Sequence, residues 1–357
     1  MQLRNRGELQ LLREIRRRFS PAPGAPSSGV VIGIGDDAAV VDPKGKKVLV
    51  TTDMMNEGTH FDLDFSSPFH LGFKLVSVNV SDIMAMGGSP RYLFLNISLK
   101  SDADEAFFWE LYEGISAALD LYGVELLGGD LTAAVHDAVF SATVIGEAER
   151  FVTRGGASVG DRIYVTQPTG DSACGLELLK RLTPESREAV RKERFGEGRP
   201  GRREGGAHRD LEVVVHSSAT IVSWKRTEPL LARHLMPAAR DPRPLLPYAS
   251  AMIDVSDGLF IDLSRICEES GVGARVYLDR VPLSDALRYA AEVMELDPFS
   301  LAVSGGEDYE LLFTAPADSV PGAFCIGEIT GGERVVVGRD GRETPLKGEG
   351  YQHFGPA

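Results

Sequence analysis

The chain alternates between short apolar runs and longer segments in which apolar residues recur at helical spacing. Four runs are dense in β-branched and apolar residues and predict strands, at residues 30–34, 48–52, 92–99 and 139–145. Helices are predicted at 68–86 and 103–122, because each of these segments ends at a glycine, Gly87 and Gly123 respectively. A short amphipathic helix is also predicted at 8–19, before a loop rich in proline and glycine. Strands and helices that alternate in this way predict an α/β (α+β) fold.

A second series of strands and helices begins at 162–166, after a predicted crossing at 153–157. We therefore predict two domains, residues 1–152 and residues 153–357. The segment 183–210 differs from the rest, because it holds eight Lys and Arg and six Asp and Glu residues but very few apolar ones. Such a segment cannot bury enough apolar surface to offset its loss of conformational entropy, so a flexible insertion is predicted there.

Composition predicts a globular chain without a membrane span. Of the 357 residues, 43% are hydrophobic and 25% are charged, and no run approaches the roughly 18 apolar residues that a span needs. The N-terminal segment lacks the apolar stretch and the cleavage site of a signal peptide. Cys174, Cys267 and Cys325 show no CxxC spacing, so neither a disulfide framework nor a thiolate zinc site is predicted. These features predict a cytoplasmic protein.

Net charge narrows the range of partners. The chain carries 38 Lys and Arg against 52 Asp and Glu, which gives a formal net charge of -14 at pH 7. That charge opposes general binding to nucleic acid or to an anionic membrane. A phosphate-containing ligand would need cations in order to approach such a chain.

Asp and Glu recur beside Gly, Ser or Thr in short blocks that are spread over both halves of the chain. The blocks lie at residues 33–38, 51–53, 79–82, 128–130, 254–258 and 304–310. A single block of this kind is typical of a turn. Repetition at the predicted ends of strands favours a shared site, because open α/β sheets bind ligands at the carboxyl ends of their strands. Clustered carboxylates repel one another unless divalent cations lie among them, so the pattern predicts a multi-metal phosphate site.

Other nucleotide-binding and hydrolase motifs are excluded, because the residues around each match do not suit the chemistry that the motif requires. Residues 33–38 match a GxGxxA dinucleotide fingerprint, but Asp36 and Asp37 would repel a pyrophosphate. Residues 156–160 match a nucleophile elbow, yet a predicted strand and not a helix follows them. The sequence has no P-loop, no protein-kinase blocks and no HExxH pattern. His60 is kept as a candidate histidine, because it follows an acidic block by one short loop.

Together, the blocks resemble those of the thiamine-monophosphate kinase family, which uses ATP to make thiamine diphosphate. The matching segments are Gly7 to Leu9, GIGDDAAV at 33–40, TTDMMNEGTHF at 51–61, KLVSVNVSDIMAMGGSP at 74–90, LLGGDLT at 126–132, TRGGASVGD at 153–161, IDVSDGL at 253–259, SGGEDYELLFT at 304–314 and Gly350 to Phe354. The resemblance implies the fold of the aminoimidazole ribonucleotide synthetase-like superfamily. In that fold an N-terminal domain that binds ATP and magnesium pairs across a homodimer, and a C-terminal α/β domain follows.

The resemblance also implies which residues act. The family's magnesium ligands fall on Asp37, Thr51, Thr52, Asp53, Asp82, Asp130, Asp254 and Asp257. Its nucleotide contacts fall on Gly129, Asp130, Arg154 and Ser256. Its substrate contacts fall on His60, Glu307 and Tyr351. Among all these residues, the ones expected to carry catalysis are Asp53, Asp82, Asp130 and Arg154.

The implied acceptor, thiamine monophosphate, already carries an ionised phosphate oxygen, so the reaction needs no general base. Several Mg²⁺ ions are expected to offset the repulsion between the two polyanions, and we expect direct in-line transfer without a phosphoenzyme. One alternative is another ATP-using member of the superfamily, such as a purine-pathway synthetase or a selenophosphate synthetase. The first cysteine is Cys174, whereas a selenophosphate synthetase would need a reactive cysteine near its N-terminus. The other alternative is a non-catalytic acidic protein that binds metal.

Overall fold

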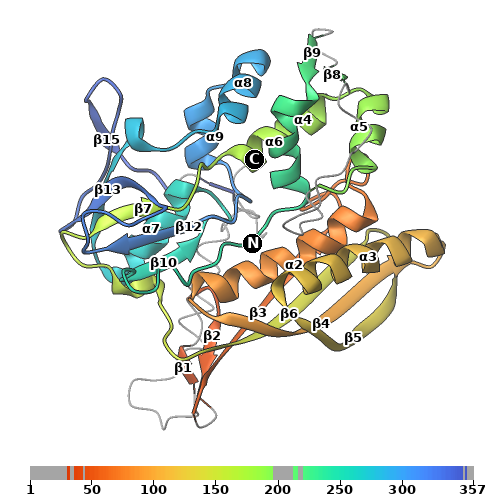
Figure 1. The fold of residues 1–357 in the computed structure, drawn as a ribbon, viewed down its shortest axis with the longest axis horizontal. Coiled ribbons are helices and arrows are strands. Elements are labelled where there is room, and N and C mark those ends of the chain that lie inside the picture. Colours follow the sequence, from red (N-terminus) through yellow and green to blue (C-terminus); the bar gives the residue numbers. More distant parts are fainter. Residues whose placement is uncertain are drawn as a thin grey trace, which may run out of the picture.

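The computed structural model of the chain describes residues 30–32, 36–42, 45–195, 212–215, 220–348 and 350–351. The helix predicted at 8–19 lies outside these described residues. Among the described residues, no helix is both long enough and apolar enough to cross a membrane. This part of the chain forms two large sheets with helices packed against them, and a separate two-stranded hairpin (Figure 1).

The first sheet is covered by two helices on one of its faces. Its strands, in spatial order, are β1 (Val30–Ile32), β2 (Ala39–Val41), β3 (Lys47–Asn56), β6 (Val139–Ala148), β4 (Ser89–Lys100) and β5 (Glu125–Ala134). Helices α2 (Pro68–Ala85) and α3 (Glu105–Tyr122) lie on one face, and the opposite face carries none of the described helices (Figure 1). The predicted strands and helices of this region are present within a few residues of their expected bounds. The apolar pattern missed β5, because Gly128 and Gly129 interrupt it.

Helix α2 links the two halves of the molecule. Apart from Asp82 and Met84, all of its residues are buried, as expected for a helix that has protein on every side. It crosses α3 where Gly72 faces Gly114, and a Cβ on either glycine would lie within 2.0 Å of a backbone oxygen of the other helix. Another side of α2 contacts β10 (Ala251–Asp254) of the second sheet. Side chains on α2 can therefore reach both halves.

The second sheet and its helices form the other half. Its strands, in spatial order, are β10, β12 (Leu311–Ala315), β7 (Arg162–Val165), β13 (Phe324–Thr330), β11 (Gly273–Tyr277), β14 (Arg334–Val337) and β15 (Glu343–Pro345). The helices of this half are α4 (Asp171–Arg181), α5 (Pro184–Arg191), α6 (Trp224–Leu235), α7 (Leu259–Ser270), α8 (Asp285–Met294) and α9 (Pro298–Ser304). The short elements are the 3₁₀ turns η2 (Arg154–Gly156) and η3 (Leu278–Arg280) and the hairpin β8 (Glu212–Val215) and β9 (Thr220–Ser223). The mixed α/β class is confirmed. The domain boundary at 152 and 153 lies between β6 and β7 and stays a prediction.

Both large sheets are mainly antiparallel, which corrects one expectation. Within the described strands, only β4 with β5 and β11 with β14 run parallel. The acidic blocks therefore do not line up at the carboxyl ends of parallel strands. Residues 51–53 lie inside β3, residues 79–82 lie inside α2 and residues 128–130 lie inside β5, whereas Asp254 ends β10. Tertiary packing, and not a shared sheet edge, decides which blocks meet.

The first part of segment 183–210 is folded, which corrects the prediction of a flexible insertion over that part. Helix α5 occupies most of it, and both Val190 and Phe195 are buried. The Phe195 ring stacks on Trp224 with 6.1 Å between ring centroids. A few apolar side chains thus anchor a segment whose composition is mostly charged. Residues 196–211 lie outside the described residues.

Candidate active site

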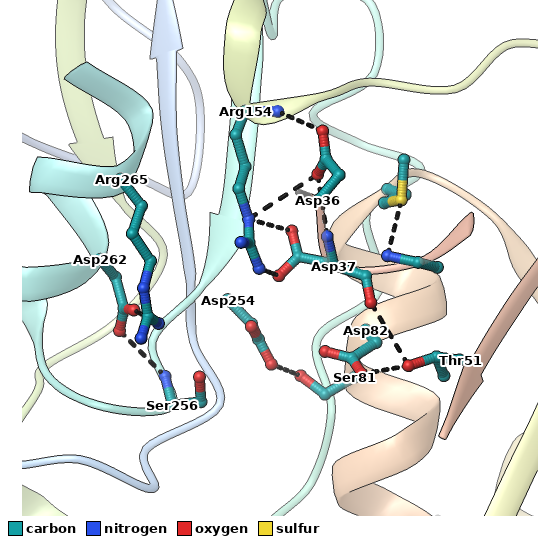
Figure 2. Close-up of polar contacts among 12 residues, drawn as sticks. Asp36, Asp37, Thr51, Ser81, Asp82, Arg154, Asp254, Ser256, Asp262 and Arg265 are labelled. Carbon is teal, nitrogen blue, oxygen red and sulfur yellow. Dashed lines mark hydrogen bonds and ion pairs between the residues drawn. The ribbon is translucent and has the colours of Figure 1, made fainter. Parts of the chain in front are cut away.

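Three carboxylates from distant parts of the chain meet where α2 approaches β10. Asp37, Asp82 and Asp254 each place one carboxylate oxygen within 4.8 Å of the others (Figure 2). Asp37 lies just before β2, Asp82 lies in the last turn of α2, and Asp254 is the last residue of β10. Carboxylate oxygens at such separations can share a divalent cation.

Hydroxyl groups hold two of these carboxylates in place. Thr51 on β3 donates through its hydroxyl to Asp82 Oδ2, at 2.5 Å. Ser81 on α2 donates to Asp254 Oδ2, at 2.6 Å. The first bond joins the first sheet to α2, and the second joins α2 to the second sheet. The cluster is therefore built from both halves of the molecule and depends on their packing.

Arg154 supplies positive charge at one side of the cluster. Its guanidinium pairs with both carboxylate oxygens of Asp37, and its Nε lies 3.2 Å from Asp37 Oδ2. Asp36 accepts hydrogen bonds from the backbone N–H groups of Asp37 and Arg154, at 2.9 and 3.2 Å. Burial, followed by repulsion from Asp37, raises the pKa of Asp36 to about 6, although Arg154 opposes that rise. Asp36 thus connects the backbones of the two residues that form the Asp37–Arg154 ion pair (Figure 2).

The remaining carboxylates of the cluster crowd one another. Burial, followed by repulsion from neighbouring carboxylates, raises the pKa of Asp82 and Asp254 well above the ordinary value. Asp53 keeps part of its side chain in solvent, yet desolvation, then Asp257 and Asp37, raise its pKa to about 6. Within the described chain, no ion pair reaches Asp53, Asp82 or Asp254. Bound cations would restore the ionised carboxylates, and this donor set of oxygens suits Mg²⁺ better than softer metals.

A turn at residues 256–258 forms a second wall of the site. Its three backbone N–H groups donate to Asp262 Oδ2, at 3.1 to 3.2 Å. Arg265 pairs with Asp262 Oδ1 at 2.6 Å and with Asp257 Oδ2 at 2.5 Å. Asp262 is fully buried, and this burial raises its pKa to about 7. Asp262 therefore organises the turn that carries Ser256, and Arg265 orients Asp257.

The predicted substrate residues Glu307 and Tyr351 are attached to the same turn. The Glu307 N–H donates to Ser256 O at 2.7 Å, and the Tyr351 N–H donates to Asp257 O at 3.1 Å. The Tyr351 side chain is exposed. His60 follows β3, and its Nδ1 accepts from the Asn56 N–H at 3.0 Å. Segments far apart in sequence thus converge on one side of the carboxylate cluster.

Glu307 has two further partners that the sequence did not indicate. Lys74 Nζ lies 2.7 Å from Glu307 Oε1, and His234 Nδ1 lies 3.3 Å from Glu307 Oε2. Burial opposes ionisation of Glu307, but the neighbouring Lys74 ammonium group outweighs burial and lowers the pKa of Glu307. Glu307 is therefore held as an anion beside the cluster.

Gly129, Asp130 and Thr52 are not brought to the cluster within one chain. Asp130 lies on the edge strand β5, in register with Asn96 of β4, and three strand spacings of about 4.8 Å separate β5 from β3. Thr52 alternates with Thr51 and so points away from α2, where its hydroxyl donates to Ala142 O at 2.9 Å. These predicted ligands therefore lie away from Asp37, Asp82 and Asp254.

One signal in the sequence could have found some of the missed residues. Lys74, Ser77 and Ser81 recur at positions i, i+3 and i+7 of a segment that is otherwise mostly apolar. A polar stripe on a buried helix indicates side chains that must find partners inside the protein. His234 and Arg265 carry no such signal, because their partners are set by packing between distant helices and loops.

Known families match most of both halves. Residues 35–148 match the family described as AIR synthase related protein, N-terminal domain, and residues 211–340 match AIR synthase related protein, C-terminal domain. Thiamine-monophosphate kinase of Aquifex aeolicus (strain VF5) is 34% identical over 326 residues, which are 90% of this chain and 92% of that protein. Thiamine-monophosphate kinase of Escherichia coli (strain K12) is 33% identical over 340 residues, 91% of this chain and 92% of that protein.

Solved structures agree with these matches. The structure described as AaThiL complexed with AMPPCP and TMP is 32% identical, covers 99% of both chains and has a TM-score of 0.78. The thiamine-monophosphate kinase of Stenotrophomonas maltophilia K279a is 30% identical, with a TM-score of 0.66 over 93% of this chain and 96% of that chain. The resemblance that the motifs indicated is confirmed along the chain. The chain belongs to the thiamine-monophosphate kinase family and has the two-domain fold of AIR synthase related proteins.

Proposed function

We propose that this protein transfers the γ-phosphoryl group of ATP to the phosphate of thiamine monophosphate, which gives thiamine diphosphate and ADP. The observation that carries the proposal is the group of Asp37, Asp82 and Asp254 beside Arg154, in a chain of this family. A relative's structure contains TMP together with AMPPCP, an analogue of ATP. We place the reaction in the cytoplasm, where ATP is made and where the three free cysteines stay reduced.

Asp37, Asp82 and Asp254 are proposed to hold Mg²⁺, with Asp53 and Asp257 at the edge of the same site. Thr51 places its hydroxyl between Asp82 and the Asp37 backbone, at 2.5 and 3.3 Å, so it can position the first carboxylate or act as a ligand itself. When bound, several Mg²⁺ ions supply the positive charge that neutralises two phosphate groups and stabilises the transferring phosphoryl group.

The chain's own side chains bind and orient the two substrates. Arg154 offers a forked guanidinium to the nucleotide phosphates, and Ser256 offers its hydroxyl from the neighbouring turn. His60, Glu307 and Tyr351 are proposed to hold the thiamine part, with the Tyr351 ring against a flat heterocycle. The acceptor phosphate is ionised at pH 7, so no residue has to remove a proton. Direct in-line transfer without a phosphoenzyme is therefore proposed.

We also propose a homodimer that pairs the helix-free face and the open edge of the first sheet. Both expose large apolar side chains, namely Met54, Tyr92, Phe94, Leu126, Leu127 and Leu131. Several exposed apolar side chains on one face and edge of a sheet are typical of a protein interface. Such pairing would bring Gly129 and Asp130 of one copy toward Thr52 and the carboxylate cluster of the other copy. The dimer thus offers a physical reason why one chain leaves these residues apart.

An assay of the purified protein tests the proposed function. Incubation with ATP, Mg²⁺ and thiamine monophosphate should give thiamine diphosphate and ADP in equal amounts, measured by chromatography, and chelation of Mg²⁺ should stop the reaction. ATP consumption without thiamine diphosphate would favour another member of the superfamily. Mg²⁺ binding without nucleotide turnover would favour the non-catalytic alternative.

A further inference from the structure

A buried lysine on one half of the molecule contacts the predicted substrate residue on the other half. Lys74 lies on α2, and only 4% of its side chain is exposed. Its Nζ lies 2.7 Å from Oε1 of Glu307, in the loop between α9 and β12. A buried ammonium group needs an anionic partner, since an unpaired charge inside a protein is strongly unfavourable. Lys74 therefore fixes where the Glu307 carboxylate can lie relative to α2.

The backbone of this loop is held in an uncommon conformation. Glu307 has φ of 65° and Tyr309 has φ of 52°, both in the left-handed region that residues other than glycine rarely adopt. Hydrogen bonds from the Glu307 N–H to Ser256 O and from the Tyr309 N–H to Val255 O hold the loop against the turn of the site. Conformations of this kind persist where surrounding contacts define them fully. The contact with Lys74 is one of the contacts that define this loop.

His234 lies next to the second oxygen of the same carboxylate. Its Nδ1 lies 3.3 Å from Glu307 Oε2 and 3.1 Å from the Ser172 hydroxyl. Burial lowers the pKa of His234 to about 3, so this ring is neutral at pH 7. Lys74 thus supplies positive charge to Glu307, while the neutral His234 ring lies beside the second carboxylate oxygen. The Glu307 side chain remains 29% exposed, so its oxygens can still accept hydrogen bonds from a ligand.

We propose that Lys74 is a positioning residue that sets the orientation of Glu307 toward the thiamine part of thiamine monophosphate. This inference rests on the proposed function. Thiamine carries a cationic thiazolium ring and an amino group on its pyrimidine, and a carboxylate of fixed direction suits both groups. Lys74 is too deeply buried to offer its own ammonium group to the substrate, so it acts through Glu307. The nucleotide side at Arg154 and Asp37 does not involve this pair.

Steady-state kinetics of three variants tests the proposal, with wild-type turnover measured first. Lys74→Met should raise KM for thiamine monophosphate about tenfold and leave KM for ATP within about twofold, since only one substrate is misplaced. Glu307→Gln should raise the same constant. The KM of the double variant for thiamine monophosphate should exceed that of Glu307→Gln by no more than about twofold, because the effects of two residues that act through one contact are not additive. Lys192→Met is the matched control, since Lys192 is 70% exposed, directly follows α5 and, among the described residues, forms an ion pair only with Glu188 one turn earlier.

The outcomes separate this inference from the proposed function. If wild type makes thiamine diphosphate while Lys74→Met keeps its KM for thiamine monophosphate, or raises both KM values equally, the positioning role is wrong and the function stands. Additive effects in the double variant would also overturn it. If Lys74→Met does not fold, the double variant, which lacks the unpaired anion, is compared with Glu307→Gln. A wild-type protein that neither binds nor phosphorylates thiamine monophosphate overturns both.

Discussion

Two groups of carboxylates in this molecule differ in how their charge is balanced. Glu310 is fully buried, and it accepts from Arg233, from Arg240 at 2.6 and 2.7 Å, and from the Thr166 hydroxyl at 2.6 Å. Asp82, in the cluster, accepts from the Thr51 hydroxyl, and within the described chain no ion pair reaches it. Both positions are costly for an ionised group in the absence of partners.

The difference shows which buried acids can do chemistry. At Glu310 the protein supplies the compensating charge itself, so a ligand has nothing to add there. In the cluster Arg154 pairs with Asp37, but among the described residues no ion pair reaches Asp82 or Asp254, so three carboxylates share one arginine (Figure 2). A polar group that the fold leaves unbalanced is a better sign of a site than burial or a raised pKa alone.

The largest expected effect comes from a change inside the cluster. Asp82→Asn should lower kcat by about 10³-fold or more, because it removes an anionic ligand at the point where the three carboxylates meet. Its fold should be intact, since the change relieves repulsion among carboxylates. Steady-state kinetics at saturating Mg²⁺, with circular dichroism as the folding control, measures both. Turnover within tenfold of wild type would remove Asp82 from the site.

The next prediction concerns Glu310, whose charge the protein itself balances. Glu310→Gln should lower the free energy of unfolding by about 3 kcal/mol, because it leaves Arg233 and Arg240 without their anion. The folded fraction should keep kcat within about tenfold of wild type, since Glu310 has no proposed role in transfer. Urea denaturation and activity of the native fraction test this contrast. An unfolding free energy equal to that of wild type would mean that the arginines do not depend on Glu310.

Asp130 tests whether a second copy completes the cluster. Asp130→Asn should lower kcat about 10²-fold by removing a metal ligand. Equal amounts of Asp130→Asn and Asp82→Asn chains, unfolded and refolded together, should recover about a quarter of wild-type activity. Half of the dimers would be mixed, and each mixed dimer would hold one site with both aspartates. No recovery in demonstrably mixed dimers would show that Asp130 acts within its own chain.

The smallest expected effect is the pH dependence of Mg²⁺ affinity. The raised pKa values of the cluster, about 6 for Asp53 and well above the ordinary value for Asp82 and Asp254, mean that protons occupy these carboxylates at acid pH. Mg²⁺ must displace those protons, so affinity should weaken about tenfold from pH 7.5 to pH 5.5. Isothermal titration calorimetry at both pH values measures this. An affinity that rises as the pH falls would contradict the raised pKa values.

The sequence predicts much of the fold and part of the site. Asp37, Asp82 and Asp254 are recoverable from short motifs, because each motif places its carboxylate locally. The polar stripe on α2 marks Lys74 as a residue that needs a buried partner, but it does not name that partner. The contacts of Lys74 and His234 with Glu307 exist only after α2, α6 and a distant loop have packed. The expected sheet-edge site is wrong for a related reason, since strand direction depends on pairing between distant segments. Local pattern therefore predicts elements, and packing decides their partners.

Anomalous diffraction from a manganese-soaked crystal tests the proposed metal site most directly. Mn²⁺ takes the same oxygen ligands as Mg²⁺ and gives an anomalous signal. A peak is expected about 2.2 Å from oxygens of Asp37, Asp82 and Asp254, and no peak is expected beside Glu310, where the arginines already supply the charge. A map without a peak among the three carboxylates, or with one at Glu310, would contradict the claim that unbalanced carboxylates mark the metal site.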